Sequence, residues 1–136
     1  MVWWNLNYFP IIVAAIIYVV IGAIWYSPAV FGKLWMQWSD CDPDACKGKR
    51  AVVAWVGSFV VGLVVAWGLS VLIHNLGYTT FIAGGYVGIL AWAGFVMTTQ
   101  FGGVLWGGKH LFVWLIHAGC SLITLWVMGG IIASWV

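Results

Sequence analysis

Trp25-Tyr26-Ser27-Pro28-Ala29-Val30-Phe31-Gly32-Lys33-Leu34-Trp35-Met36 ends the first long apolar run of the chain and contains its first charged residue, Lys33. Proline has no backbone N–H and disfavours the α conformation of the residue before it, so Ser27-Pro28 predicts the end of a helix. The next residues favour a short interfacial segment, with Lys33 and Gln37 toward water or phosphate. The side chains expected in the headgroup boundary are Phe31, Leu34, Trp35 and Trp38.

The composition indicates that lipid is the main solvent of this chain. Of its 136 residues, 65% are hydrophobic and 6% are charged, whereas about a quarter of the residues of a soluble domain are charged. The net charge of +2 gives no reason to expect nucleic acid as a partner, because the basic residues cluster in one short loop. The first apolar run has no basic segment before it and no small-residue cleavage site after it, so we expect a membrane helix rather than a signal peptide.

Four apolar runs reach the length of about 20 residues that crosses a ~30 Å hydrocarbon core. Gly77 predicts a left-handed cap at the end of the second run, and the glycines of residues 101–110 predict a loop between the third and fourth runs. We therefore expect an all-α fold, an integral membrane four-helix bundle that forms a single transmembrane domain over residues 1–136. The expected spans are residues 6–26, 51–76, 80–100 and 111–136.

The basic residues predict the orientation in the membrane. Four of them lie in the first connection and one in the third, and four spans place these two connections on the same side. The other side, with both termini, has no basic residue, so the positive-inside rule places both termini outside and the basic loops in the cytoplasm. The basic residues are Lys33, Lys47, Lys49, Arg50 and Lys109.

The first connection, residues 39–50, has some features of a metal site. Its aspartates alternate as at the start of an EF-hand calcium loop, but Ala45 and Ala51 occupy the positions that need Gly and Glu. Cys41 and Cys46 could bind zinc together with His110, although a fourth ligand is missing. The alternating aspartates are Asp40, Asp42 and Asp44.

A structural role explains the same loop better. Asp42 is expected to cap the second membrane helix, with Pro43 at its first position and Asp44 beside the positive end of the helix dipole. Lys47, Lys49 and Arg50 would then contact the anionic inner surface of the membrane. We therefore expect no metal, with metal binding by the two cysteines as an open alternative.

Small residues mark the faces through which helices can pack in lipid, where close packing replaces the hydrophobic effect. They recur every four residues in the second and third spans, and each span offers at least one place where a neighbour can approach. The predicted helix-packing face consists of Ser58, Gly62, Ala66, Ser70, Gly84 and Gly88.

A polar stripe along the fourth span is the candidate functional site. His117 lies about seven residues into the span, roughly 10 Å deep, and an ionisable residue at that depth points by default to function. The alternative is a hydrogen bond from a neutral imidazole to Thr98, Thr99 or Gln100 on the third span. The stripe consists of His110, His117, Ser121 and Thr124.

Catalysis and cofactor binding have little support in the sequence. No Asp or Glu lies in any span and the chain contains no Glu, so His117 has no acid partner for nucleophilic catalysis. His74 and His117 would be ~25 Å apart along the membrane normal, too far to hold one haem within a single chain. We expect a protein that is not an enzyme, with no catalytic residues and no cofactor.

The segment from Trp25 to Met36 resembles the signature of a family of small bacterial membrane proteins catalogued as domain of unknown function 1761. Gly119, Ser121, Leu122, Met128-Gly129 and Ile131 are similar to the family's less distinctive C-terminal pattern. The resemblance implies four spans in a bacterial cytoplasmic membrane and supplies no activity. The matching signature residues are Gly22, Trp25, Tyr26, Ser27, Pro28, Phe31, Gly32, Lys33, Trp35 and Met36.

These observations favour a non-enzymatic structural or accessory component of a membrane oligomer or larger complex. The small-residue faces and the 12 tryptophans, which offer large rigid contact areas, motivate this hypothesis. The alternative is an oligomeric channel or transporter for a small solute or ion, with the stripe on the fourth span lining its path.

The orientation predicts how Cys41 reacts in intact cells. Because its loop is expected in the cytoplasm, a membrane-impermeant thiol reagent should label Cys41 only after the membrane is permeabilised. Rapid labelling of Cys41 in intact cells would reverse the predicted orientation.

Overall fold

The structure, a computed structural model, describes residues 3–38 and 48–135, and throughout these ranges the regular secondary structure is helical. Four helical runs are long and apolar enough to cross a membrane, and they pack together, so the predicted all-α four-helix membrane bundle is confirmed. The first, second and fourth runs are α1 (Tyr8–Trp25), α3 (Lys49–Leu76) and α6 (Leu111–Ser134). The third run consists of α4 (Phe81–Ala91), the π-helical turn η2 (Trp92–Val96) and α5 (Met97–Leu105), and the short α2 (Gly32–Trp38) follows α1.

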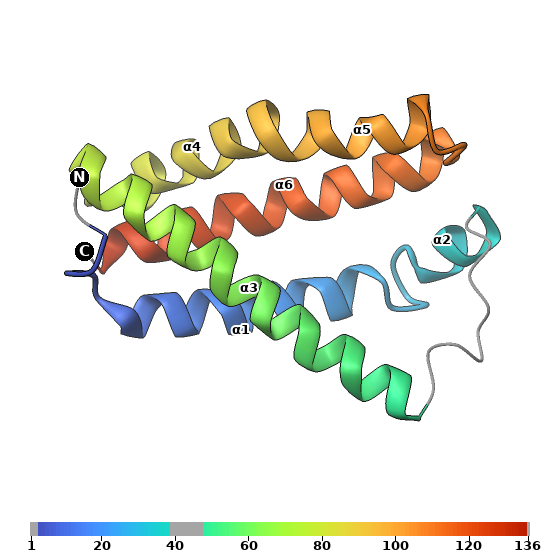
Figure 1. Ribbon diagram of the computed structural model, residues 1–136, viewed down its shortest axis with the longest axis horizontal. Helices are drawn as coiled ribbons and strands as arrows, with labels where there is room; N and C mark the ends of the chain where they lie inside the picture. Colours follow the sequence, from blue (N-terminus) through green and yellow to red (C-terminus); the bar gives the residue numbers. More distant parts are fainter. Residues whose placement is uncertain (1–2, 39–47, 136) are drawn as a thin grey trace.

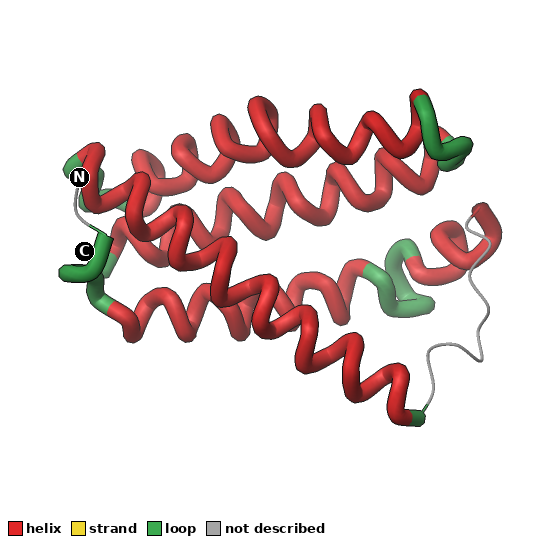
Figure 2. Tube along the Cα trace, viewed as in Figure 1, coloured by secondary structure: helices red, strands yellow, loops and turns green. Residues whose placement is uncertain are grey.

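The two termini lie at one end of the bundle, and α2, the start of α3 and the α5–α6 connection lie at the other (Figure 1). Helix α3 crosses the other helices diagonally, and its first half diverges from α1 (Figure 2). The four basic residues within the described ranges therefore lie at the end opposite the termini, as the even number of spans requires. They are Lys33 on α2, Lys49 and Arg50 in the first turn of α3, and Lys109 before α6.

Local sequence signals explain where the helices begin and end. Helix α1 stops at Trp25, just before Ser27-Pro28, as predicted. Gly77 ends α3 in the left-handed conformation (φ 73°, ψ 21°), also as predicted. The side chain of Thr80 accepts a hydrogen bond from Ala83 N at 3.3 Å, which caps the start of α4.

The prediction of a loop over residues 101–110 is wrong in its first half, because α5 continues to Leu105. Gly102 and Gly103 lie inside this helix, and the chain turns back only after it. The carbonyl of Gly103 accepts hydrogen bonds from the N–H groups of Gly107 (3.0 Å) and Lys109 (3.1 Å). Of the glycines in residues 101–110, only Gly108 needs the left-handed backbone (φ 68°).

Helices α4 and α6 pack backbone to backbone near the terminal end of the bundle. A Cβ atom on Gly84 would lie 2.1 Å from the carbonyl oxygen of Gly129, and one on Gly88 would lie 2.1 Å from that of Leu125. Only glycine fits at such positions, so Gly84 and Gly88 serve as the predicted packing face within one chain.

The contact between α1 and α3 begins at Gly62. A Cβ atom there would lie 3.1 Å from the Cβ of Tyr18 and 3.2 Å from the carbonyl oxygen of Ala15. The next predicted face residues, Ala66 and Ser70, are buried, whereas Ser58 is only half-buried. The face therefore works from Gly62 onward, and before Gly62 the two helices separate.

The π-helical turn η2 changes which residues of the third span face the bundle. In an uninterrupted α-helix that buries Gly88, residues 95 and 99 would lie on the same face, two and three turns later. Yet Phe95 is 73% exposed and Thr99 is exposed. The wider turn shifts the face by one residue and brings Gln100 inward instead. Gly94, within η2, has no neighbouring atom within 4 Å of a Cβ built on it.

The close approach of α4 and α6 predicts that Gly84→Ala destabilises the fold. The added methyl group must push two backbones apart, which should lower the free energy of unfolding in detergent by about 1–3 kcal/mol. The matched control is Gly102→Ala, where a Cβ atom meets nothing within 4 Å. Equal stability of the two variants would contradict the packing described here.

Candidate functional site

The signature segment forms a compact turn between α1 and α2. The carbonyl of Ser27 accepts hydrogen bonds from Val30 N (3.1 Å) and Gly32 N (2.9 Å). A Cβ atom on Gly32 would lie 2.4 Å from the carbonyl oxygen of Tyr26, so this position requires glycine. The hydroxyl of Ser27 donates to Ile24 O at 2.7 Å and closes the end of α1. These contacts give Tyr26, Ser27 and Gly32 a role in shaping the turn.

The same segment attaches α1 and α2 to α6. The indole N–H of Trp25 donates to the carbonyl of Ile116 at 3.0 Å, and the hydroxyl of Tyr26 is hydrogen-bonded to Nδ1 of His117. The ring of Trp35 lies edge-on to the imidazole of His117, with 6.4 Å between ring centres. Phe31 packs against Trp25, whereas the signature residues Pro28, Lys33 and Met36 are exposed.

The partner of His117 is therefore not one of those that the sequence suggested. Thr98 and Thr99 donate to carbonyls of their own helical run, Thr98 to Gly94 O at 2.9 Å and Thr99 to Val96 O at 3.1 Å. Gln100 faces the same cavity as His117, but no hydrogen bond joins them within the described part of the chain. The hydrogen bond to His117 comes instead from the signature residue Tyr26.

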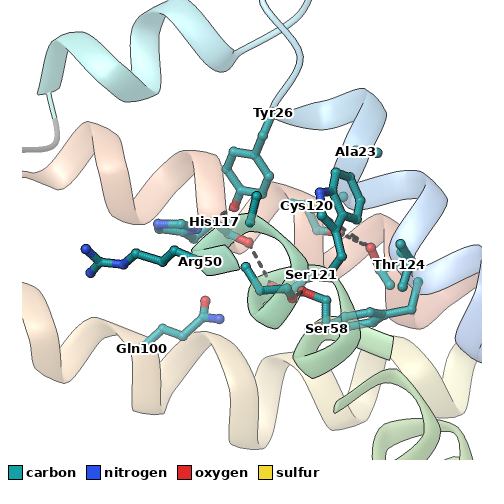
Figure 3. A pocket seen from close by; sticks show the side chains of 15 residues that line it. Ala23, Tyr26, Arg50, Ser58, Gln100, His117, Cys120, Ser121 and Thr124 are labelled. Carbon is teal, nitrogen blue, oxygen red and sulfur yellow. Dashed lines mark hydrogen bonds between the residues drawn. The ribbon is translucent and has the colours of Figure 1, made fainter. Parts of the chain in front are cut away.

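A cavity of about 640 Å³ lies between α1, α3, α5 and α6, where α3 diverges (Figure 3). It reaches from Arg50 in the first turn of α3 to Thr124 in the middle of α6. Three residues of the predicted stripe line it, namely His117, Ser121 and Thr124. The full lining is Tyr18, Val19, Gly22, Ala23, Tyr26, Arg50, Ala51, Ala54, Trp55, Ser58, Gln100, His117, Cys120, Ser121 and Thr124.

The hydroxyl groups in the cavity wall donate to the backbone of their own helices. Ser121 donates to the carbonyls of His117 and Ala118 at 3.0 Å, and Thr124 donates to Cys120 O at 2.7 Å. Ser58 donates to Ala54 O at 2.7 Å on the facing helix. Because each hydroxyl uses its only proton, its oxygen is left as an acceptor for other groups.

Gln100 contributes the least satisfied polar atom of this site. Its side-chain oxygen Oε1 is buried, and no donor within residues 3–38 and 48–135 lies in hydrogen-bond reach. A buried polar atom without a partner typically costs about 1–3 kcal/mol. Figure 3 shows the Gln100 side chain at the same end of the cavity as Arg50 and His117.

His110 lies apart from the rest of the predicted stripe. It is the N-cap of α6, where its Nδ1 accepts a hydrogen bond from Phe112 N at 3.2 Å, and it does not line the cavity. Its ring stacks on Trp38 of α2, with 4.4 Å between ring centres. His110 therefore joins α2 to the start of α6.

No group of three or more metal-binding side chains occurs within the part of the chain that the structure describes. Asp40, Cys41, Asp42, Pro43, Asp44, Cys46 and Lys47, on which the calcium and zinc interpretations depend, lie outside the described residues. The prediction that Asp42 caps the second membrane helix is wrong, because α3 begins at Lys49 and Gly48 is its N-cap (φ 70°), without a side-chain hydrogen bond. Among the residues inside the described ranges, Cys120 is a buried free thiol, and it lines the cavity.

Toward the termini, the cavity is closed by the core of the bundle. Beyond Thr124 the interior is filled by the core side chains Ile73, Met128 and Ile132, each with 0% exposure. The described residues include no carboxylate, so the polar groups of the site are one guanidinium, one imidazole, one amide and several hydroxyls. Such a site can bind a small polar group by hydrogen bonds and one positive charge.

Comparison with known proteins gives one match. A family model described as "Protein of unknown function (DUF1761)" matches residues 9–133, nearly the whole chain. No curated protein and no solved structure matches.

The contact between Tyr26 and His117 predicts an energetic coupling between α1 and α6. In a double-mutant cycle of Tyr26→Phe and His117→Leu, the coupling energy should be about 0.6 and at most about 1.7 kcal/mol, the range for hydrogen bonds between membrane helices. Unfolding in detergent measures it. A control cycle of Tyr8→Phe and His117→Leu should give no coupling, because the hydroxyl of Tyr8 donates to Trp4 O. Additive effects of Tyr26→Phe and His117→Leu would argue against the contact.

Proposed function

The chain belongs to the DUF1761 family of proteins of unknown function, and we propose that it is a non-enzymatic membrane protein that binds a small polar ligand in the cavity between α1, α3, α5 and α6. The observation that carries this proposal is the buried, unsatisfied oxygen of Gln100 in the wall of a cavity of about 640 Å³. A volume of this size lies within the usual range of ligand sites. A bound ligand would supply the donor that the described residues do not.

Binding is favoured over catalysis by the way the reactive groups are engaged. The hydroxyls of Ser121 and Thr124 donate to backbone carbonyls, so neither donates to His117 as a nucleophile would. Nδ1 of His117 is hydrogen-bonded to the hydroxyl of Tyr26, and no carboxylate within the described ranges orients the ring. A hydrolase would need a nucleophilic hydroxyl that is hydrogen-bonded to an imidazole. Ser121, Thr124 and His117 supply these groups, but neither hydroxyl donates to the imidazole.

An open pore through one chain has less support than a binding cavity. The described core closes the end near the termini with Ile73, Met128 and Ile132, so a solute could cross only if the helices rearranged. The stripe residues His117, Ser121 and Thr124 line a cavity within a single chain. A path through these residues would therefore not need several copies of the protein.

We keep assembly into an oligomer or a larger complex as part of the proposal. The small residues of the helix-packing face support it less than the sequence suggested. Gly62, Gly84 and Gly88 contact other helices of the same chain and are not available to a partner. The remaining support is the exposed first half of α3, with Val52, Val53 and Val56, a surface that lipid covers equally well. A bacterial inner-membrane location with both termini outside completes the proposal, on the basis of the basic residues at one end.

The proposed cavity predicts that water-soluble reagents reach Ser58. With Cys41, Cys46 and Cys120 replaced by serine or alanine, a Ser58→Cys variant in vesicles should react with a small charged thiol reagent from the basic side. Val56→Cys is the matched control, because Val56 is 60% exposed but lies outside the cavity, on the lipid side of α3. We expect at least about tenfold faster labelling at position 58, since a thiol reacts as the thiolate, which needs water. Equal rates at both positions would mean that the cavity is dry, and the proposed function would then fail.

A further inference from the structure

We infer that the ligand of the cavity is an oxyanion that also carries a hydrogen-bond donor, as in the phosphate ester of a polyol or amino alcohol. This inference rests on the proposed function and adds the chemical class of the ligand. It follows from three groups that Figure 3 shows together at one end of the cavity, Arg50, His117 and Gln100.

The first of these groups is the guanidinium of Arg50. Arg50 lines the cavity from the first turn of α3, where it is exposed, whereas the adjacent Lys49 does not line the cavity. All three acidic residues of the chain lie in residues 39–47, outside the described ranges, so the described cavity wall has a positive charge and no negative one. A guanidinium stays charged and presents a planar fork of donors that matches two oxygens of a phosphate or carboxylate. The part of the cavity wall that the structure describes therefore favours an anion over a cation.

The second group is the imidazole of His117. Its Nδ1 is hydrogen-bonded to the hydroxyl of Tyr26. With the Tyr26 hydroxyl as the donor, Nδ1 accepts this hydrogen bond and the neutral imidazole carries its proton on Nε2, which makes Nε2 a donor. The signature turn thus determines which nitrogen of His117 can donate. An oxyanion beside Arg50 would receive a second hydrogen bond from this nitrogen.

The third group, Gln100, requires something that a bare anion cannot offer. Its buried Oε1 is an acceptor, and a fully deprotonated oxyanion has only acceptors. A hydroxyl or ammonium group next to the anionic group would donate to Gln100 while the oxygens face Arg50. The hydroxyl oxygens of Ser121 and Thr124 offer further acceptors deeper in the cavity.

Two sources can supply this chemistry. One is the headgroup of an anionic lipid that enters from the bilayer, and the other is a soluble phosphorylated alcohol that enters from the basic side. Dihexanoyl phosphatidylglycerol and glycerol 1-phosphate are suitable probes, because they share the phosphate and hydroxyl groups and only the first has acyl chains.

The experiment is calorimetric titration of the purified full chain in neutral detergent with each probe. Arg50→Gln should weaken binding of the better probe about tenfold or more, the typical effect of losing a charged hydrogen bond. Lys49→Gln removes the same charge from the neighbouring residue, and it should change the affinity less than about twofold, because Lys49 does not line the cavity. Gln100→Leu should also weaken binding, without any change of charge.

The outcomes separate this inference from the proposed function. Binding that weakens in Arg50→Gln and Gln100→Leu but not in Lys49→Gln supports the inference. The probe that binds better identifies the lipid or the soluble source. Equal weakening by Arg50→Gln and Lys49→Gln overturns it, because attraction to the basic surface would then explain the binding. Failure of both probes to bind, while Ser58→Cys is still labelled quickly, overturns the ligand class and leaves the proposed cavity intact.

Discussion

The structure depends on the direct contact between the backbones of α4 and α6. Lipid offers helices no hydrophobic reason to associate, so dispersion contacts at short range must hold the bundle together. Gly84 and Gly88 on α4 and Gly129 on α6 allow that approach, and all three lie near the end with the termini. The bundle is therefore tightly closed at that end. At the other end, the part of α3 that precedes Gly62 in the chain separates from α1, and the cavity forms between them.

Tryptophan contributes to this bundle as a hydrogen-bond donor as well as a large apolar surface. The indole N–H groups of Trp25, Trp92 and Trp114 each donate to a backbone carbonyl of a neighbouring helical run, at 3.0, 2.8 and 3.3 Å. These acceptors already belong to helical backbone, so each bond joins two helices without an extra polar side chain. Part of the tryptophan content is thus explained inside one chain, which reduces the need for partner chains to explain it.

The candidate site arises where two structural devices meet. The signature turn places Tyr26 against His117 on α6, and the π-helical turn of the third span directs Gln100 into the same cavity. Arg50 reaches this cavity because α3 begins away from the bundle. A regular four-helix bundle would have filled this volume with side chains. The irregular elements are therefore the ones that create a place for a ligand.

Local sequence features were enough to predict the four spans, the ends of α1 and α3 and the basic end of the bundle. They also predicted the polar stripe of four residues, three of which line the cavity. These features follow from hydropathy, proline and glycine, which act within a few residues of the chain. The partner of His117, the separate location of His110 and the role of Gln100 were decided only by the tertiary structure. Residues 26 and 117 are far apart in the chain, and the one-residue shift at η2 has no local sequence signal that we recognise. Close packing between distant helices, rather than local preference, selected those contacts.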